Sequence, residues 1–349
     1  MPKAIIAKSP NFLIYIMIFV TGLLFRPAPA TSQTAGFADA PLSQPLVLPD
    51  WFKLSFLDFR EDLHDANRNK RGLIIYFGRH DCPYCKAQLE KNWGQPDIVT
   101  YTRAHFDVVA IDVLGDRRVT DFAGREMSEK EFAIAHRANF TPTLFFYDNQ
   151  GKLALKLAGY RPPYQFRAAL EYAADHHQQE GSFRSYLARA ENAESYGYDT
   201  LNPYPDFHPP AFLTDYSQHK HRKPLLLVFE RGHCHACDVL HAGPLNQPQI
   251  RQLMDRIDAV QLNMWRDVPV VTPQGKHTTS KRWAEQLGLS YAPTLIFYAG
   301  NGKEIIRIDS VLGFYRLRGV LRYVLSDGYR KFPTYQQWRS QKANSVPPS

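Results

Sequence analysis

The sequence of 349 residues predicts an α/β fold in which one structural unit occurs twice in tandem. Three observations support this prediction. The chain is long enough for about two domains, its halves match each other at an offset of about 151 residues, and each half alternates short apolar runs with segments of helical pattern. Duplication of one α/β unit is the simplest explanation.

Each predicted unit begins with a buried strand that leads to a pair of cysteines. The apolar run over 72–77 leads to Cys82, and the run over 224–229 leads to Cys234. Short apolar runs of this kind are typical of buried strands. A helix is expected at each pair, and in both units a Gln-Pro step follows thirteen residues after the first cysteine.

The later elements follow in the same order in both units. They are a second strand, a polar segment, a helix starting near a serine, a strand after a proline, and a final helix. In the first unit they lie at 106–113, 119–124, Ser128, 143–147 and 163–175, and in the second at 257–264, 270–275, Ser280, 294–298 and 315–326.

The first 30 residues have the pattern of a secretory signal peptide. Two lysines precede a 14-residue apolar run over 12–25, and Ala28-Pro29-Ala30 supplies small residues at the expected cleavage site. An uncleaved membrane anchor is the alternative, but a membrane-spanning helix needs about 20 apolar residues. We therefore expect cleavage after Ala30 and a periplasmic protein, whose formal net charge falls from +8 to +5.

The remaining segments and charges complete the expected organisation. The domains are expected at 50–175 and 211–330, joined by a linker or extension over 176–210 with a helix near 182–195, and the tail over 331–349 is expected to be mobile in part. Basic residues are interspersed with acids and no nucleic-acid motif is found, so nucleic acid is not expected as a partner.

The four cysteines of the chain form two Cys-x-x-Cys pairs, Cys82-Pro-Tyr-Cys85 and Cys234-His-Ala-Cys237. Cysteines that only staple a fold would be expected to close longer loops, which stabilise more. A shared zinc site is the alternative, but 149 residues separate the pairs, whereas zinc knuckles are usually roughly 15 to 20 residues apart. Two separate pairs, each of closely spaced cysteines, therefore predict redox chemistry.

A strand that enters Cys-x-x-Cys at a helix start, with a Thr-Pro or Ala-Pro step about 60 residues later, resembles the thioredoxin superfamily. The resemblance covers roughly 50–175 and 210–330. Within the superfamily, the motif Asp81-Cys-Pro-Tyr-Cys-Lys86, the segment 115–121 and Gly159-Tyr160 are similar to the exported SoxW-like thioredoxins.

This resemblance implies two tandem thioredoxin-like domains, each with a central mixed β-sheet flanked by helices. It also implies a cis peptide bond before Pro142 and before Pro293, in loops that would bind an extended substrate through Thr141, Pro142, Ala292 and Pro293. Many relatives carry a buried acid six residues before the first cysteine, where this chain has Tyr76 and Val228. Glu230 is either a substitute for that acid or a strand residue facing solvent.

The expected mechanism gives each cysteine a role. A helix start favours the thiolate, so Cys82 and Cys234 are expected to be the nucleophiles, and Cys85 and Cys237 the resolving thiols. The chain is thus predicted to be an exported thiol–disulfide oxidoreductase without a cofactor, more a reductase or isomerase than an oxidase. Its expected partners are cysteine-containing exported proteins and a membrane electron donor.

Histidines around the second pair leave two alternatives open. His233 and His235 could stabilise the Cys234 thiolate, which would make the second pair the more oxidising one. Together with His241 they could instead form a copper or zinc site with the cysteines, as in a metallochaperone.

Overall fold

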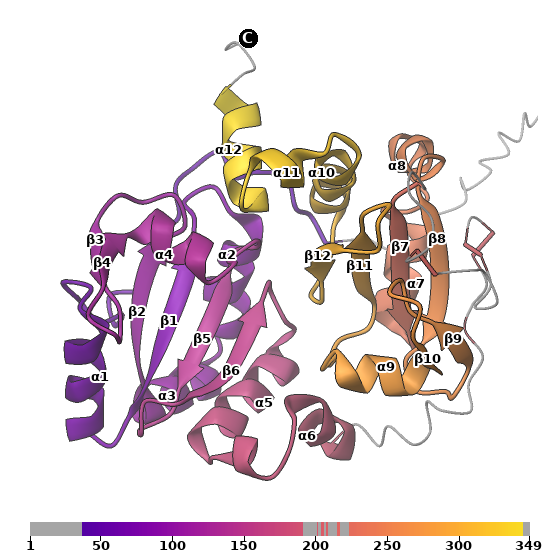
Figure 1. The fold of residues 1–349 in the computed structure, drawn as a ribbon. Coiled ribbons are helices and arrows are strands. Elements are labelled where there is room, and N and C mark those ends of the chain that lie inside the picture. Colours follow the sequence, from indigo (N-terminus) through magenta and orange to yellow (C-terminus); the bar gives the residue numbers. More distant parts are fainter. Residues whose placement is uncertain are drawn as a thin grey trace, which may run out of the picture. The chain divides into compact units, whose positions relative to one another are not determined.

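The structure is a computed structural model that describes residues 37–190, 201, 204, 205, 207, 208, 215, 216 and 223–344 (Figure 1). The predicted signal peptide and its cleavage site lie outside the described residues. Within the described ranges, no helix is both long and apolar enough to cross a membrane.

The first half contains a four-stranded mixed sheet, as predicted. Its strands lie in the order β2-β1-β5-β6 and comprise β1 (Gly72–Gly78), β2 (Phe106–Asp112), β5 (Thr143–Tyr147) and β6 (Leu153–Ala158). The first strand pairs in parallel with β2 and antiparallel with β5, which in turn pairs antiparallel with β6. A short hairpin of β3 (Arg118–Thr120) and β4 (Glu126–Ser128) corresponds to the predicted polar segment.

Helices cover both faces of this sheet, and β1 is therefore buried along its whole length. Leu73, Ile75 and Phe77 pack on one face against α1 (Phe59–Arg68) and α4 (Glu129–Ala135). Ile74 and Tyr76 pack on the other face. The helices on that side are α2 (Pro83–Ala87), a π-helical turn η1 (Gln88–Asn92), α3 (Pro96–His105) and α5 (Pro163–Ala174).

The second half repeats the same topology. Its sheet has the order β12-β11-β7-β8, with β7 (Leu225–Glu230), β8 (Asp258–Asn263), β11 (Thr294–Tyr298) and β12 (Glu304–Ile308), and its hairpin consists of β9 (Pro269–Val271) and β10 (His277–Thr279). Helices α7 (His235–Ala242), α8 (Pro248–Met254), α9 (Ser280–Gln286) and α10 (Phe314–Leu325) complete it. The predicted α/β duplication is therefore confirmed.

Side-chain caps determine where the helices predicted near Ser128 and Ser280 begin. Ser128 caps α4 in a capping box with Glu131, as its position predicted. In the second half the cap is Thr279 and Ser280 is the first helical residue, so this helix also begins near its predicted serine. Both Ser and Thr hydroxyls can accept the free backbone N–H groups of a helix start.

Short helices also lie after each of the two repeats. After the short 3₁₀ turn η2 (His177–Gln179), the expected linker helix is found as α6 (Phe183–Ala190), and residues 191–200 lie outside the described ranges. The tail contains α11 (Gly328–Lys331) and α12 (Tyr335–Asn344), and Tyr335 and Trp338 are buried. Part of the predicted tail over 331–349 is thus a packed helix, residues 345–349 lie outside the described ranges, and its partial mobility stays a prediction.

Candidate functional site

Each cysteine pair lies at the start of a helix and forms a disulfide. Cys82 caps α2, and its Sγ accepts the backbone N–H of Cys85 at 3.0 Å. Cys234 caps α7 in the same way and accepts the N–H of Cys237 at 3.1 Å. This geometry brings unpaired backbone N–H groups to the first sulfur of each pair, where they favour a thiolate over a thiol.

The predicted proline loops lie directly against these sulfurs. The peptide bonds before Pro142 and Pro293 are both cis. In the first domain the Thr141 hydroxyl donates to Cys82 Sγ at 3.2 Å, and the Thr141 carbonyl oxygen lies 3.4 Å from the same sulfur. In the second domain the Ala292 carbonyl oxygen lies 3.7 Å from Cys234 Sγ.

The interior of the first motif is covered. Pro83 and Tyr84 are buried together with both cysteines of the pair. The Tyr84 hydroxyl donates to Asp39 at 2.8 Å and accepts the backbone N–H of Gly313 at 2.8 Å, so residues before and after the first domain meet on this side chain. Burial raises the pKa of Tyr84 well above its ordinary value, which keeps the phenol neutral.

Asp39 also caps α10 in this covering layer. Its carboxylate accepts the backbone N–H groups of Tyr315 and Arg316 at 2.9 Å and 2.8 Å. The N-cap position of α10 is Gly313, which has no side chain to cap the helix, and a carboxylate 276 positions before Tyr315 takes that role. One side chain thus joins the N-terminal segment, the first motif and the second domain.

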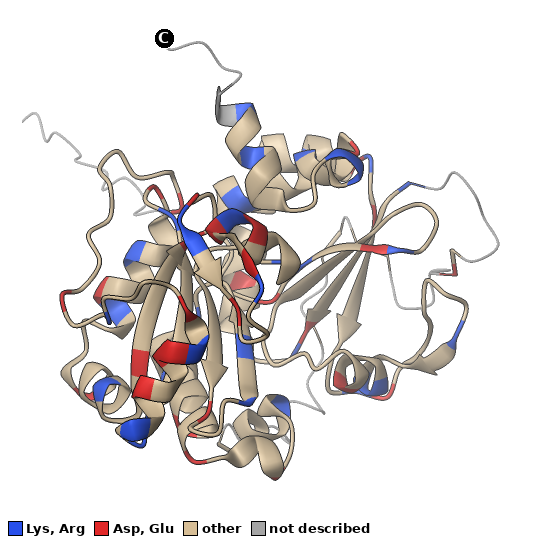
Figure 2. Cartoon of the chain, turned by 60° about the vertical axis from the view of Figure 1, so that its left-hand side comes forward, with Lys and Arg blue, Asp and Glu red and all other residues tan. Residues whose placement is uncertain are grey.

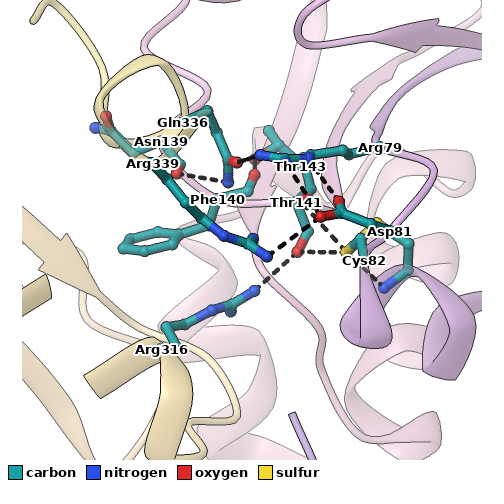
Figure 3. Close-up of a disulfide and its surroundings, with 11 residues drawn as sticks. Arg79, Asp81, Cys82, Asn139, Phe140, Thr141, Thr143, Arg316, Gln336 and Arg339 are labelled. Atoms are coloured by element: carbon teal, nitrogen blue, oxygen red, sulfur yellow. Dashed lines mark hydrogen bonds and ion pairs between the residues drawn. A yellow bond between two sulfur atoms is a disulfide. The ribbon is translucent and has the colours of Figure 1, made fainter. Parts of the chain in front are cut away.

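Arg316 extends from α10 to the first active site (Figure 3). Its guanidinium packs 3.4 Å from the centre of the Tyr84 ring, and its Nη2 donates to the Thr141 carbonyl at 2.9 Å. Burial lowers the pKa of Arg316, while Tyr84 and Asp39 beside it act in the opposite direction. The carbonyl that the family resemblance offers to an extended substrate is thus already occupied.

Helix α12 makes further contacts at the same place (Figure 3). Gln336 Nε2 donates to the Asn139 carbonyl at 3.1 Å, and Arg339 Nη2 lies 3.5 Å from the carboxylate of Asp81, the residue before Cys82. The sequence analysis did not predict that α12 covers the first active site. The available signal was the pair Tyr335 and Trp338, two aromatic residues at i and i+3 in a tail otherwise rich in polar residues.

The second motif is more open and has a different set of neighbours. His233 and His235 are exposed and Ala236 is half-buried, in contrast to the buried interior of the first motif. Beneath the motif, the Glu230 carboxylate is 2 % exposed and contacts His241 Nε2 and Gln261 Nε2, each at 2.6 Å. Of the two readings of Glu230, the buried one holds.

Glu230 and His241 are close in sequence to the second pair, since Glu230 precedes Cys234 by four residues. His241 follows Cys237 by four residues on α7, so the two side chains share one face of the helix. The first domain has Gly78 at the position of Glu230 and a neutral, fully buried Tyr76 nearby, whose pKa burial raises further above its ordinary value. The two sites therefore differ in the ionisable side chains that lie near the cysteine pair.

The metal-binding alternative for the second pair concerns His233, His235 and His241. Among the described residues, no group of three or more His, Cys, Asp or Glu side chains is arranged to hold a metal ion. His241, one of the proposed ligands, contacts Glu230 instead.

Comparison with known protein families identifies this architecture. The family described as thioredoxin-like domain matches residues 59–174 and again residues 215–325. The chain belongs to this thioredoxin-like family. No curated protein matches the chain.

Several solved structures are similar to parts of this thioredoxin-like chain. A thioredoxin-fold protein from Helicobacter pylori is 26% identical, with 36% of this chain and 86% of that chain covered and a TM-score of 0.31. A thioredoxin from Thermus thermophilus is 26% identical, with coverages of 33% and 82% and a TM-score of 0.26. A disulphide isomerase from Xylella fastidiosa is 20% identical, with coverages of 42% and 98% and a TM-score of 0.25.

Family membership and the two redox pairs together define the chemistry. A thioredoxin-like protein with a Cys-x-x-Cys disulfide at a helix start in each domain is a dithiol–disulfide oxidoreductase. The individual roles of the four cysteines and the domain ranges 50–175 and 211–330 stay predictions.

Proposed function

We propose that the protein is an exported thiol–disulfide reductase or isomerase that acts on cysteine-containing exported proteins. The observation that carries this proposal is the repeated juxtaposition of a helix-capping cysteine and a cis-proline loop, at Cys82 with Pro142 and at Cys234 with Pro293. The second domain supports protein substrates in particular, because His235 in its motif is exposed and Ala236 and Ala292 are only half-buried.

The reaction follows from the positions of the two sulfurs in each reduced pair. The Cys234 thiolate attacks one sulfur of a substrate disulfide, a mixed disulfide forms, and the other substrate sulfur leaves as a thiolate. Cys237 then attacks Cys234, the Cys234–Cys237 disulfide forms, and the second substrate sulfur is released. Two electrons pass from the dithiol to the substrate, and Glu230 with His241 supplies and accepts protons beside the resolving thiol.

Export and reductant supply are part of the same proposal. The pattern over residues 1–30 supports transfer to the periplasm with cleavage after Ala30. There the oxidised pairs would be re-reduced by a membrane electron donor, which matches the similarity of the first motif to SoxW-like thioredoxins. N-terminal sequencing of the protein isolated from a periplasmic fraction tests this part, and an intact N-terminus in the cytoplasm contradicts it.

Equilibrium redox potentials separate a reductase from an oxidase. Each pair is titrated against glutathione or dithiothreitol in a variant whose other pair is replaced by serines, Cys82→Ser with Cys85→Ser or Cys234→Ser with Cys237→Ser. Potentials near or below about −200 mV for both pairs support the proposal. A value near about −120 mV for either pair would indicate disulfide formation instead.

A further inference from the structure

A pocket of about 220 Å³ lies beside the first active site. Its floor includes Cys82, Pro83 and Tyr84 of the first motif, and its other walls come from α10, α12 and the N-terminal segment around Asp39. The pocket is therefore lined both by Cys82 of the first domain and by side chains from outside that domain.

The walls of this pocket are strongly basic. Five cationic side chains line it and only one carboxylate does. The cations are Arg316, Arg318 and Arg322 on α10 and Arg339 and Lys342 on α12. The single carboxylate, Asp39, is already engaged by one hydroxyl and two backbone N–H groups. Figure 2 shows these C-terminal helices carrying Lys and Arg.

Arg316 forms part of the pocket wall and is largely buried. The side chain is only 7 % exposed, and its Nη2 donates to the Thr141 carbonyl. Its Nη1 is buried without a hydrogen-bond partner among the described residues and lies next to Gly159. The case for an anionic ligand therefore rests on the five cationic side chains of the pocket, because such groups pair most strongly with anionic oxygens.

The size of the pocket limits what that ligand can be. Its volume is smaller than the roughly 300 to 1,000 Å³ of pockets that take drug-sized molecules. In addition, the Thr141 carbonyl that would pair with an extended chain already accepts a hydrogen bond from Arg316. Both observations favour a small acid over a segment of a protein.

We propose that this basic pocket binds small anionic disulfides, organic disulfides that carry carboxylate or sulfonate groups, and presents their sulfur to Cys82. The inference rests on the proposed function in one respect, that the reduced Cys82 is an attacking thiolate. It assigns the first site to small acidic substrates and leaves protein substrates to the second site.

The exchange balances in atoms and electrons. The Cys82 thiolate attacks one sulfur of the small disulfide, its S–S bond breaks, and one organic thiolate leaves as the mixed disulfide forms. Cys85 then attacks Cys82, which releases the second organic thiolate and forms the Cys82–Cys85 disulfide. The dithiol loses two electrons and the substrate gains them, and an external dithiol such as dithiothreitol restores the reduced pair.

Three disulfides of matched size and different charge test the proposal. They are the dianion 3,3′-dithiodipropionate, the neutral 2-hydroxyethyl disulfide and the dication cystamine, each mixed with the full chain in which Cys234 and Cys237 are replaced by serine and the first pair is reduced. Exchange rates are measured by acid quenching and mass spectrometry. We expect the dianion to react about tenfold faster than the neutral disulfide, and the dication more slowly than both.

Matched variants locate the effect in the pocket. Arg322 is exposed on α10 and lines the pocket, and Arg322→Gln is expected to lower the dianion rate about threefold without changing the neutral rate. Arg330→Gln removes an exposed arginine from α11 that does not line the pocket, and should leave both rates unchanged. The chain with only the second pair intact provides the intrinsic reactivity of the three disulfides.

The outcomes separate this inference from the proposed function. The same order of rates at both pairs, or equal effects of Arg322→Gln and Arg330→Gln, overturns the anion pocket while leaving the oxidoreductase intact. No exchange with any of the three disulfides at either pair of a folded, reduced protein would overturn the proposed function itself.

Discussion

Replacing Arg316 by glutamine tests the electrostatic coupling between the two domains at the first active site. The Thr141 carbonyl oxygen lies 2.9 Å from Arg316 Nη2 and 3.4 Å from Cys82 Sγ, which places the guanidinium within about 6 Å of the sulfur. At an effective dielectric constant of about 20, a charge pair at this distance gains roughly 2 to 3 kcal/mol, or about two pKa units.

Arg316→Gln is expected to make the Cys82 thiolate less stable relative to the thiol, and to do so at the first pair only. The pKa of Cys82 should rise by about one to two units, and because the reduced form loses stabilisation, the redox potential of the pair should fall by tens of millivolts. Glutamine retains a donor for the Thr141 carbonyl, so the hydrogen bond is affected less than the charge.

The assay is the pH dependence of alkylation of Cys82 by iodoacetamide, followed by mass spectrometry, in the reduced protein. Cys234 in the same sample is the internal control, since Arg316 contacts the first site. Circular dichroism and the urea unfolding midpoint show whether the variant is folded. A Cys82 pKa that stays within about 0.3 units of the wild-type value in a folded variant would refute the reasoning.

Three further changes follow from the same structure. Asp39→Ala removes the cap of α10 and the hydrogen-bond partner of Tyr84. It should lower the free energy of unfolding by about 1 to 2 kcal/mol, measured by urea titration, and it should speed alkylation of Cys82. An unchanged urea midpoint would contradict this role of Asp39. Glu230→Gln should slow exchange at the second pair about tenfold and leave the first pair unaffected, as single-pair variants would show; equal rates would exclude it from proton transfer. Burial lowers the pKa of His136 below its ordinary value of 6.5, so the unfolded chain takes up a proton more readily and stability should fall as pH drops through about 6.5. His136→Gln should flatten this loss between pH 7.5 and 5.5, and an unchanged slope in urea unfolding would contradict it.

The sequence was sufficient to predict the repeated fold and the redox pairs because both depend on local patterns. Apolar runs that lead to Cys82 and Cys234 predicted the two central strands, and the family resemblance, which the repeated proline step helped to establish, implied the loops against the sulfurs. Each of these signals spans a few residues of chain, and the duplication supplied it twice.

The covering of the first site could not be predicted, because it depends on contacts between residues far apart in sequence. Arg316 meets Thr141 across 175 positions, and Asp39 caps a helix across more than 270. Nothing in the local pattern of either residue indicates its partner. The orientation of Glu230 was open for a related reason, since strand alternation alone does not say which face of β7 is buried when helices cover both.

Trapping of mixed disulfides tests the central claim most directly. A chain with Cys85→Ser and Cys237→Ser retains the predicted nucleophiles and lacks the resolving thiols, whereas Cys82→Ser with Cys234→Ser retains only the resolving thiols. After incubation with a disulfide substrate and acid quenching, mass spectrometry of the first variant should show adducts at Cys82 and Cys234, and the second variant should show few or none. Adducts mainly on Cys85 and Cys237, or on no cysteine of a folded protein, would contradict the account.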